Sequence, residues 1–213
     1  MSQEAEKLLL MLYLYYGRLQ QASTAEGSVA VRTLLAQILT QLDLPPQSIE
    51  KSCQGRPFLP SAPFLDISFS HTATLAACAL LDKRPLLSEA ASSTEAIQAW
   101  QIGVDAEPLT SPSSRDPHAF SHRFFGKHEQ ALVATASDAA RAMLEIFTVK
   151  EAYAKQCGEG LARHLSGSDT MAPDFCKRNG VCFKRFLLAH HTLALCLPSS
   201  LANIDVKYIE VDL

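Results

Sequence analysis

The sequence predicts an α+β fold made of two similar α/β halves, residues 1–103 and 104–213, in a pseudo-twofold arrangement. Two observations support this prediction. Each half contains a helical pattern followed by stretches with the alternation or the apolar composition of strands. Residues 70–80 of the first half also resemble residues 189–197 of the second, because both carry histidine and threonine ahead of an apolar run with one cysteine.

The first half opens with an apolar run at residues 7–17, whose uniform composition fits a strand or a helix equally. Residues 28–42 carry apolar side chains at helical spacing, with Ser28 available as an N-cap, and predict an amphipathic helix. Residues 66–71 alternate between polar and apolar side chains and predict a strand. Residues 74–81 predict a second strand that is buried on both faces.

Two segments near the junction of the halves have no strand pattern. Residues 83–100 are rich in serine, alanine and glutamate, and fit either a surface excursion or a short helix over 92–100. Residues 108–117 hold three prolines and three serines. This composition predicts a loop, because proline and serine favour turns over regular structure.

The second half predicts helices at residues 127–136 and 138–157. The longer helix has a continuous apolar stripe, and Gly158 follows it as a residue suited to a left-handed C-cap. The remaining chain shows apolar and β-branched stretches separated by turn residues. These stretches predict three strands, at 181–188, 192–197 and 204–213.

The composition is that of an ordinary globular protein, with 47% hydrophobic residues, 19% charged residues and a net charge of −3. No basic block stands out, so we expect no nucleic-acid binding. The run at 7–17 is too short to cross a bilayer, and Glu4 and Glu6 precede it where a signal peptide would be basic. The six cysteines form no CxxC pair. We therefore expect core thiols and a cytoplasmic protein.

Three carboxylates are the strongest chemical signal in the chain. Asp105 and Glu107 stand two residues apart after an apolar run, so both side chains leave an extended strand on the same side. Glu151 lies on the apolar stripe of the predicted helix, one turn before Lys155. Carboxylate oxygens are the ligands that Mg²⁺ prefers. The alternative reading is a solvated strand end before Pro108 and an exposed ion pair on the helix.

Other polar positions have a structural and a functional reading when each is taken alone. Arg56, between Gly55 and Pro57, fits a turn charge, and His71 fits a satisfied residue at a strand end. Glu129 fits an acid in the first turn of a helix, where the helix dipole favours it.

The order of these residues along the chain is similar to that of a known family. The motifs that carry the resemblance are Gly55-Arg56-Pro57, Ile67-Ser68-Phe69-Ser70-His71-Thr72, Gly103-Val104-Asp105-Ala106-Glu107, Phe124-Phe125 with Glu129, Lys150-Glu151-Ala152-Tyr153-Ala154-Lys155 and Gly158-Glu159-Gly160-Leu161. Over residues 50–165 the chain resembles the 4′-phosphopantetheinyl transferases of the larger, surfactin-synthetase-activating type. The resemblance implies one chain of two similar halves with the active site in the cleft between them.

The resemblance also implies the reaction, in which the 4′-phosphopantetheine group of coenzyme A is transferred to a serine of an apo acyl or peptidyl carrier protein. It implies a Mg²⁺ ion held by Asp105, Glu107 and Glu151, with Glu151 or Glu129 as the base. It places Lys150 and Lys155 near the phosphates. The expected partners are coenzyme A and the carrier protein, and we expect a monomer.

The adenine-side 3′-phosphate of coenzyme A is the other group for which the resemblance implies ligands. These are Arg56 and His71, with Ser70 and Thr72 as hydrogen-bond donors. They belong to the first half of the chain, whereas the three carboxylates and the catalytic helix belong to the second.

The chain departs from the family pattern at Phe147, where the family often has tryptophan, at Val104 and Ala106, where it has isoleucine, and at Ala73, where it has a smaller residue, often glycine. None of these changes removes a charged group. The length of the 83–100 segment is unusual for the family.

A docking surface for an acidic carrier protein is also suggested. Arg123 and Lys127 would supply cations and Phe124 or Phe125 an apolar anchor, whereas the alternative places both phenylalanines in the core. Two other functions fit part of the pattern. They are a different Mg²⁺-dependent phosphate-transferring enzyme and a non-catalytic module that binds carrier proteins.

Overall fold

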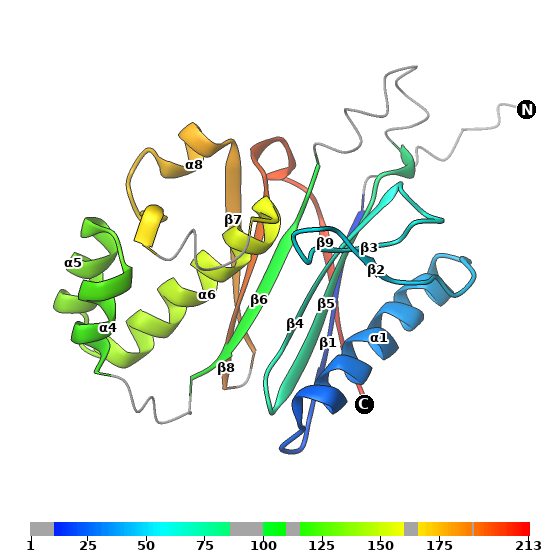
Figure 1. Cartoon of the computed structure of the whole chain (residues 1–213), viewed down its shortest axis with the longest axis horizontal. Helices are drawn as coiled ribbons and strands as arrows, with labels where there is room; N and C mark the ends of the chain where they lie inside the picture. The colour runs from blue at the N-terminus through cyan, green and yellow to red at the C-terminus, as the bar shows by residue number, and fades with distance from the viewer. Residues whose placement is uncertain (1–10, 86–99, 110–115, 160–165, 189) are drawn as a thin grey trace, which may run out of the picture.

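The computed structural model describes residues 11–85, 100–109, 116–159, 166–188 and 190–213, and their helices and strands are labelled in Figure 1. The first sheet has the strand order β4 (Leu65–His71), β5 (Leu75–Asp82), β1 (Met11–Arg18) and β9 (Val206–Val211). The second sheet has the order β6 (Gly103–Pro108), β8 (His191–Pro198) and β7 (Val181–Leu188). Neighbouring strands are antiparallel, except that β1 and β9 are parallel.

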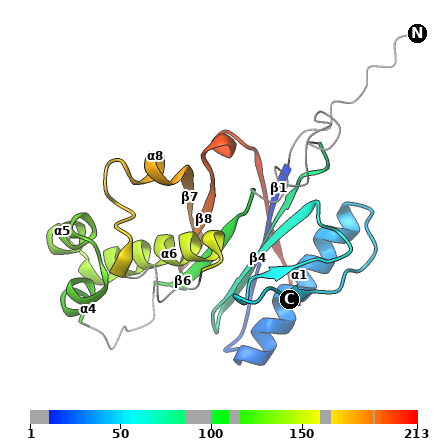
Figure 2. The same ribbon diagram turned by 45° about the horizontal axis from the view of Figure 1, so that its top comes forward.

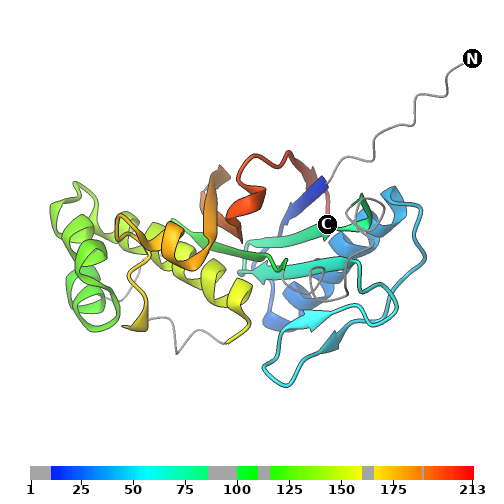
Figure 3. The ribbon, with the colours of Figure 1, turned by 90° about the horizontal axis from the view of Figure 1, so that it is seen from above.

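Helices cover the outer faces of the two sheets (Figures 1 and 2). Helix α1 (Thr24–Gln41) packs its apolar stripe on the first sheet, and α6 (Ala139–Cys157) packs on the second. The inner faces share one apolar core, in which leucines of β1 and β5 meet leucines of β8. Helices α4 (Pro117–Phe124) and α5 (Lys127–Thr135) pack on the other side of α6. Seen from above, α1 lies at one end and α4 and α5 at the other (Figure 3).

The two sheets meet at their edge strands, β4 and β6, through side chains. Asp66 accepts a hydrogen bond from the backbone N–H of Ile102 at 2.7 Å, and Ser68 accepts from Val104 at 3.0 Å. Ser70 continues the series by accepting from Ala106 at 3.2 Å. Alternate residues of a strand point to the same side, so the polar positions of β4 form a ladder along β6. This side-chain ladder leaves the opposite face of β4, with Ile67 and Phe69, against α1.

Most of the predicted elements are confirmed, and β1 settles the apolar run at 7–17 as a strand from Met11 onward. The predicted cap of the first helix was wrong. Helix α1 begins at Thr24, and Ser23 caps it in a reciprocal capping box with Glu26. Ser28 lies inside the helix and donates to the carbonyl of Thr24 at 2.9 Å. Most of the segment 83–100, including the optional helix over 92–100, lies outside the described residues.

The second half agrees with its predicted helices and strands within a few residues. Helices α4 and α8 (Phe175–Asn179) were not predicted. The first copy of the internal echo spans the turn between β4 and β5, whereas the described part of the second, residues 190–197, covers most of β8, which pairs with β7. The final strand β9 pairs with β1, so the first sheet contains residues from both predicted halves. The pseudo-twofold relation itself stays a prediction.

The small hairpin of β2 (Glu50–Lys51) and β3 (Pro57–Phe58) projects beside α1 and carries Gly55 and Arg56 at its turn. Within the described residues, no helix is long and apolar enough to cross a membrane.

Candidate active site

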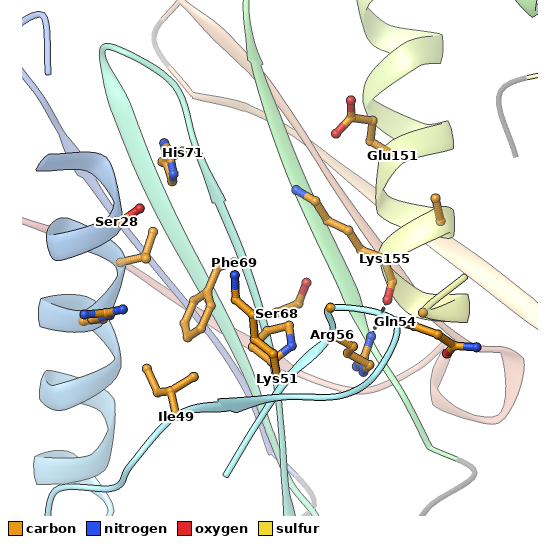
Figure 4. Close-up of a pocket in the computed structure, with 16 residues that line it drawn as sticks. Ser28, Ile49, Lys51, Gln54, Arg56, Ser68, Phe69, His71, Glu151 and Lys155 are labelled. Carbon is orange, nitrogen blue, oxygen red and sulfur yellow. Dashed lines mark hydrogen bonds between the residues drawn. The ribbon is translucent and has the colours of Figure 1, made fainter. Parts of the chain in front are cut away.

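A cleft of about 430 Å³ lies between α1 and α6, with β4 at its base and the β2–β3 hairpin along one side (Figure 4). Its wall contains four of the residues predicted from the sequence, and these come from three separate parts of the chain. They are Arg56, His71, Glu151 and Lys155.

Asp105 of β6 joins this cleft through its contact with α6. Its Oδ1 atom accepts a hydrogen bond from the Ser70 hydroxyl at 2.9 Å and lies 2.6 Å from the Lys155 ammonium. Its Oδ2 atom is buried and has no hydrogen-bond partner among the described residues. A buried carboxylate oxygen without a partner is costly, so this atom is a candidate ligand for a cation.

Gly103 explains how β6 comes so close to α6. A Cβ atom at this position would collide with the carbonyl oxygen of Ala152. The strand therefore lies directly against the helix backbone, which brings Asp105 to Lys155 on the same helix.

The three predicted metal ligands influence one another electrostatically. Burial raises the pKa of Glu151 to about 8, the negative charges of Asp105 and Glu107 add to this effect, and Lys155 opposes it. The three carboxylates thus lie close enough to Lys155 and to one another to interact at the α6 side of the cleft.

The residues present fit a hard divalent cation in their chemistry. They offer three carboxylates, and Asp105 contributes an oxygen that has no other partner. Within the described residues, no group of three His, Cys, Asp or Glu side chains is already arranged closely enough to hold a metal ion. Lys155 lies against Asp105 where such an ion would be expected, so the ligands have to rearrange before an ion can bind.

Lys150 and Glu129 lie away from the cleft. Both side chains are fully buried and form an ion pair at 2.8 Å. Glu129 also accepts hydrogen bonds from the backbone of Gly126 and from Thr170, and the Lys150 ammonium reaches the carbonyl of Ser168. Burial lowers the pKa of Lys150, and the charge of Glu129 opposes this change. The pair therefore joins α5, α6 and the segment around Thr170.

Arg56 lines the cleft, but its guanidinium is occupied by the protein. It donates to the Asp66 carboxylate at 2.7 Å, to the carbonyl of Ile102 at 3.0 Å and to the carbonyl of Lys155. The side chain is 9% exposed. Arg56 thus connects the β2–β3 hairpin to β4, to the start of β6 and to the last turn of α6.

His71, Ser70 and Thr72 end β4 in three different environments. The His71 ring lines the cleft and packs on Gly27 of α1, where a Cβ atom would lie 2.5 Å from Nδ1. Ser70 is buried beside Asp105. The Thr72 hydroxyl accepts hydrogen bonds from the backbone N–H groups of Thr74 and Leu75 in the β4–β5 turn.

Two cations of the cleft were not predicted. Arg32 of α1 and Lys51 of β2 both line it, and neither forms an ion pair in the part of the chain that the structure describes. Arg32 lies one turn after Ser28, which also lines the cleft. The sequence contained a signal for this face of α1, because Ser28 and Arg32 both border the apolar stripe of that helix.

The comparisons with known proteins point to the same region of the chain. Residues 101–196 match the family model described as the 4′-phosphopantetheinyl transferase superfamily. A curated relative, a holo-[acyl-carrier-protein] synthase of Ruthia magnifica subsp. Calyptogena magnifica, is 38% identical over 56 residues. This match covers 26% of the present chain and 44% of the relative, so it spans less than half of that protein. The stretch from β6 to β8, with Asp105, Glu151 and Lys155, is thus the part of the chain that is similar to the 4′-phosphopantetheinyl transferase superfamily.

Proposed function

We propose that the protein transfers the 4′-phosphopantetheine group of coenzyme A to a serine hydroxyl of an apo acyl or peptidyl carrier protein. The observation that carries this proposal is the meeting of Asp105, Glu151 and Lys155 at one cleft whose opposite wall bears Arg32, Lys51 and His71. Such a cleft offers carboxylates for a metal ion on one wall and cations for phosphate groups on the opposite wall. The similarity of residues 101–196 to the transferase superfamily supports the same reaction.

In the proposed reaction the serine oxygen bonds to the phosphorus that carries the pantetheine arm. The bond from that phosphorus to the bridging oxygen breaks, and 3′,5′-ADP leaves. Asp105, Glu107 and Glu151 would hold Mg²⁺, which supplies positive charge to the diphosphate when bound. The Lys155 ammonium would hold a phosphate oxygen, because fixed cations favour the charge that grows on the leaving group.

The serine hydroxyl must lose its proton during the transfer. Of the two bases implied by the family resemblance, Glu151 lines the cleft, whereas Glu129 is fully buried and holds Lys150. We therefore propose that Glu151 is the base that accepts this proton, and that Glu129 and Lys150 have a structural role. We prefer Arg32 and Lys51, with His71, over Arg56 as the candidate ligands of the 3′-phosphate, because both terminal nitrogens of Arg56 already donate hydrogen bonds within the protein and its side chain is 9% exposed.

The carrier protein is proposed to dock on the surface formed by α4 and α5. Arg123 and Lys127 are exposed there, together with three histidines, whereas Phe125 is only 5% exposed and belongs to the core. Phe124 is partly buried against the same core, and Leu132 of α5, which is 48% exposed, replaces the two phenylalanines as the proposed anchor. Helix α4 contacts α6 through Phe120, whose ring centroid lies 5.8 Å from that of Phe147, one turn before Glu151.

The test of the proposed reaction is mass spectrometry of an apo carrier protein incubated with the enzyme, coenzyme A and Mg²⁺. Asp105→Ala should lower turnover by at least about 10²-fold, as the loss of one electrostatic stabiliser does elsewhere. Glu145→Gln, at a partly exposed position of α6 that pairs with Arg141, is the control. Full turnover in excess chelator, or turnover close to that of the wild type in folded Asp105→Ala, would contradict the metal assignment. Carrier binding without any transfer would favour a non-catalytic module.

The docking surface has its own test, which is the steady-state dependence of the rate on carrier concentration. Reversing both charges, Arg123→Glu with Lys127→Glu, should raise the carrier KM and weaken its salt dependence, since rim charges act mainly on association. Coenzyme A affinity should not change. An unaltered carrier KM at low salt would place the docking surface elsewhere.

A further inference from the structure

The Lys155 ammonium occupies a position that a metal ion would also need. It lies 2.6 Å from Oδ1 of Asp105, whose side chain is only 3% exposed. The same oxygen accepts the hydrogen bond from Ser70. A divalent cation bound by Asp105 would therefore be a close neighbour of a positive charge, and like charges repel at such distances.

The side chain of Lys155 can leave Asp105 while its backbone stays in place. The backbone carbonyl is held by Arg56 and lies in the last turn of α6. The side chain is 31% exposed and extends from the helix into the cleft, as Figure 4 shows. Rotation about the side-chain bonds thus suffices to move the ammonium from Asp105 to a ligand in the same cleft.

We propose that Lys155 is an internal counter-ion that competes with the metal ion for Asp105 until coenzyme A takes it over. The inference rests on the proposed function, because it assigns the diphosphate of coenzyme A as the second partner of the ammonium. In the free protein Lys155 neutralises Asp105 and keeps metal binding weak. When the diphosphate is present, the ammonium pairs with phosphate and Asp105 becomes available.

This competition couples the two ligands. A metal ion that displaces Lys155 from Asp105 leaves the ammonium ready for phosphate, and phosphate that attracts Lys155 prepares Asp105 for the metal. Because coupling between binding sites is reciprocal, each ligand tightens the other by the same factor. Direct contact between metal and phosphate would also couple them, so the decisive quantity is metal affinity in the absence of coenzyme A.

The experiment measures Mn²⁺ binding by electron paramagnetic resonance of the free ion, because Mn²⁺ shares the preference of Mg²⁺ for oxygen ligands. Without coenzyme A, Lys155→Met should bind Mn²⁺ about tenfold more tightly than the wild type, which is within the usual range of coupling between sites. The gain in Mn²⁺ affinity on adding coenzyme A should be smaller in Lys155→Met than in the wild type.

The matched control is Lys51→Met, which removes the same charge from the same cleft but not from Asp105. It should change Mn²⁺ affinity by less than about twofold, since a more distant charge is screened. Lys155→Arg keeps a cation beside Asp105 and should stay close to the wild type. If Lys155→Met does not fold by circular dichroism, Lys155→Gln provides the same comparison.

Equal Mn²⁺ affinities for the wild type and a folded Lys155→Met or Lys155→Gln protein would overturn the inference. An increase in Mn²⁺ affinity in Lys51→Met as large as that in Lys155→Met would also overturn it, because the increase would then reflect the overall charge of the cleft. A wild-type protein that binds neither Mn²⁺ nor coenzyme A would instead contradict the proposed function, so the two failures are distinguishable.

Discussion

Replacing Glu151 by glutamine should stabilise the metal-free protein while it abolishes transfer. Burial, reinforced by the charges of Asp105 and Glu107, raises the pKa of Glu151 from 4.5 to about 8. Ionising this group in the folded protein is therefore unfavourable. Glutamine has nearly the same shape and removes the charge.

The sign and size of the effect follow from proton linkage. The folded protein keeps a proton on Glu151 that the unfolded chain releases, so stability falls as pH rises from about 4.5 to about 8 and then levels off. Each pH unit of this window corresponds to about 1.4 kcal/mol, so the free energy of unfolding lost across the whole window is at most about 5 kcal/mol. Because solvent reaches part of the side chain, we expect Glu151→Gln to gain about 2 to 3 kcal/mol near pH 8.

The assay is urea unfolding in the presence of a chelator at several values between about pH 5 and pH 8. The difference between Glu151→Gln and the wild type should be small at the acidic end and should grow towards pH 8. Glu145→Gln, which removes a partly exposed carboxylate of the same helix that pairs with Arg141, is the matched control. Parallel stability curves for Glu151→Gln and the wild type would refute the reasoning.

Three further substitutions test the positioning of the cleft. Arg56→Met removes the ion-pair partner of the largely buried Asp66 carboxylate, which keeps only the N–H of Ile102 as a hydrogen-bond donor, and should cost about 3 kcal/mol in unfolding free energy. Arg56→Lys should recover part of the loss, and a normal urea midpoint in Arg56→Met would show that the ion pair is dispensable. Gly103→Ala forces a Cβ atom into the backbone of α6 and should destabilise by about 3 kcal/mol, so a midpoint equal to that of the wild type would contradict this contact. Gly27→Ala favours the helix but displaces the His71 ring, so coenzyme A affinity by calorimetry should fall while the melting temperature is kept; unchanged affinity would remove His71 from the site.

Much of the fold could be predicted because local patterns specify it. The alternation of polar and apolar residues at 66–71 identified β4, and the apolar stripe at 138–157 identified α6. The start of α1 is also specified locally, by the capping box of Ser23 and Glu26, which the prediction of Ser28 as the N-cap missed. The first turn of α4 had a similar signal in Asp116 and Pro117, which the surrounding prolines and serines obscured.

The identity of the site residues was easier to predict than the direction in which each side chain points. Adjacent residues of a helix point about 100° apart, so Glu151 can face the cleft while Lys150 faces Glu129 on α5. Family resemblance supplied both residues, but the sequence did not show which face of α6 meets the cleft. The structural role of Arg56 could not be predicted from local sequence, because two of its partners, Ile102 and Lys155, are 46 and 99 residues away along the chain.

The side-chain ladder between β4 and β6 also bears on how this protein avoids aggregation. Both strands are edges of their sheets, and an open edge exposes N–H groups to which a strand of another molecule could add. Here Ser68 and Ser70 accept hydrogen bonds from two N–H groups of β6, and Asp66 accepts one from Ile102 just before the strand. The serines are short and polar, so a change to valine at either position would remove an acceptor and leave β6 with an unpaired donor. Such a variant should be most prone to aggregation while the chain is still folding, before the two sheets have packed together.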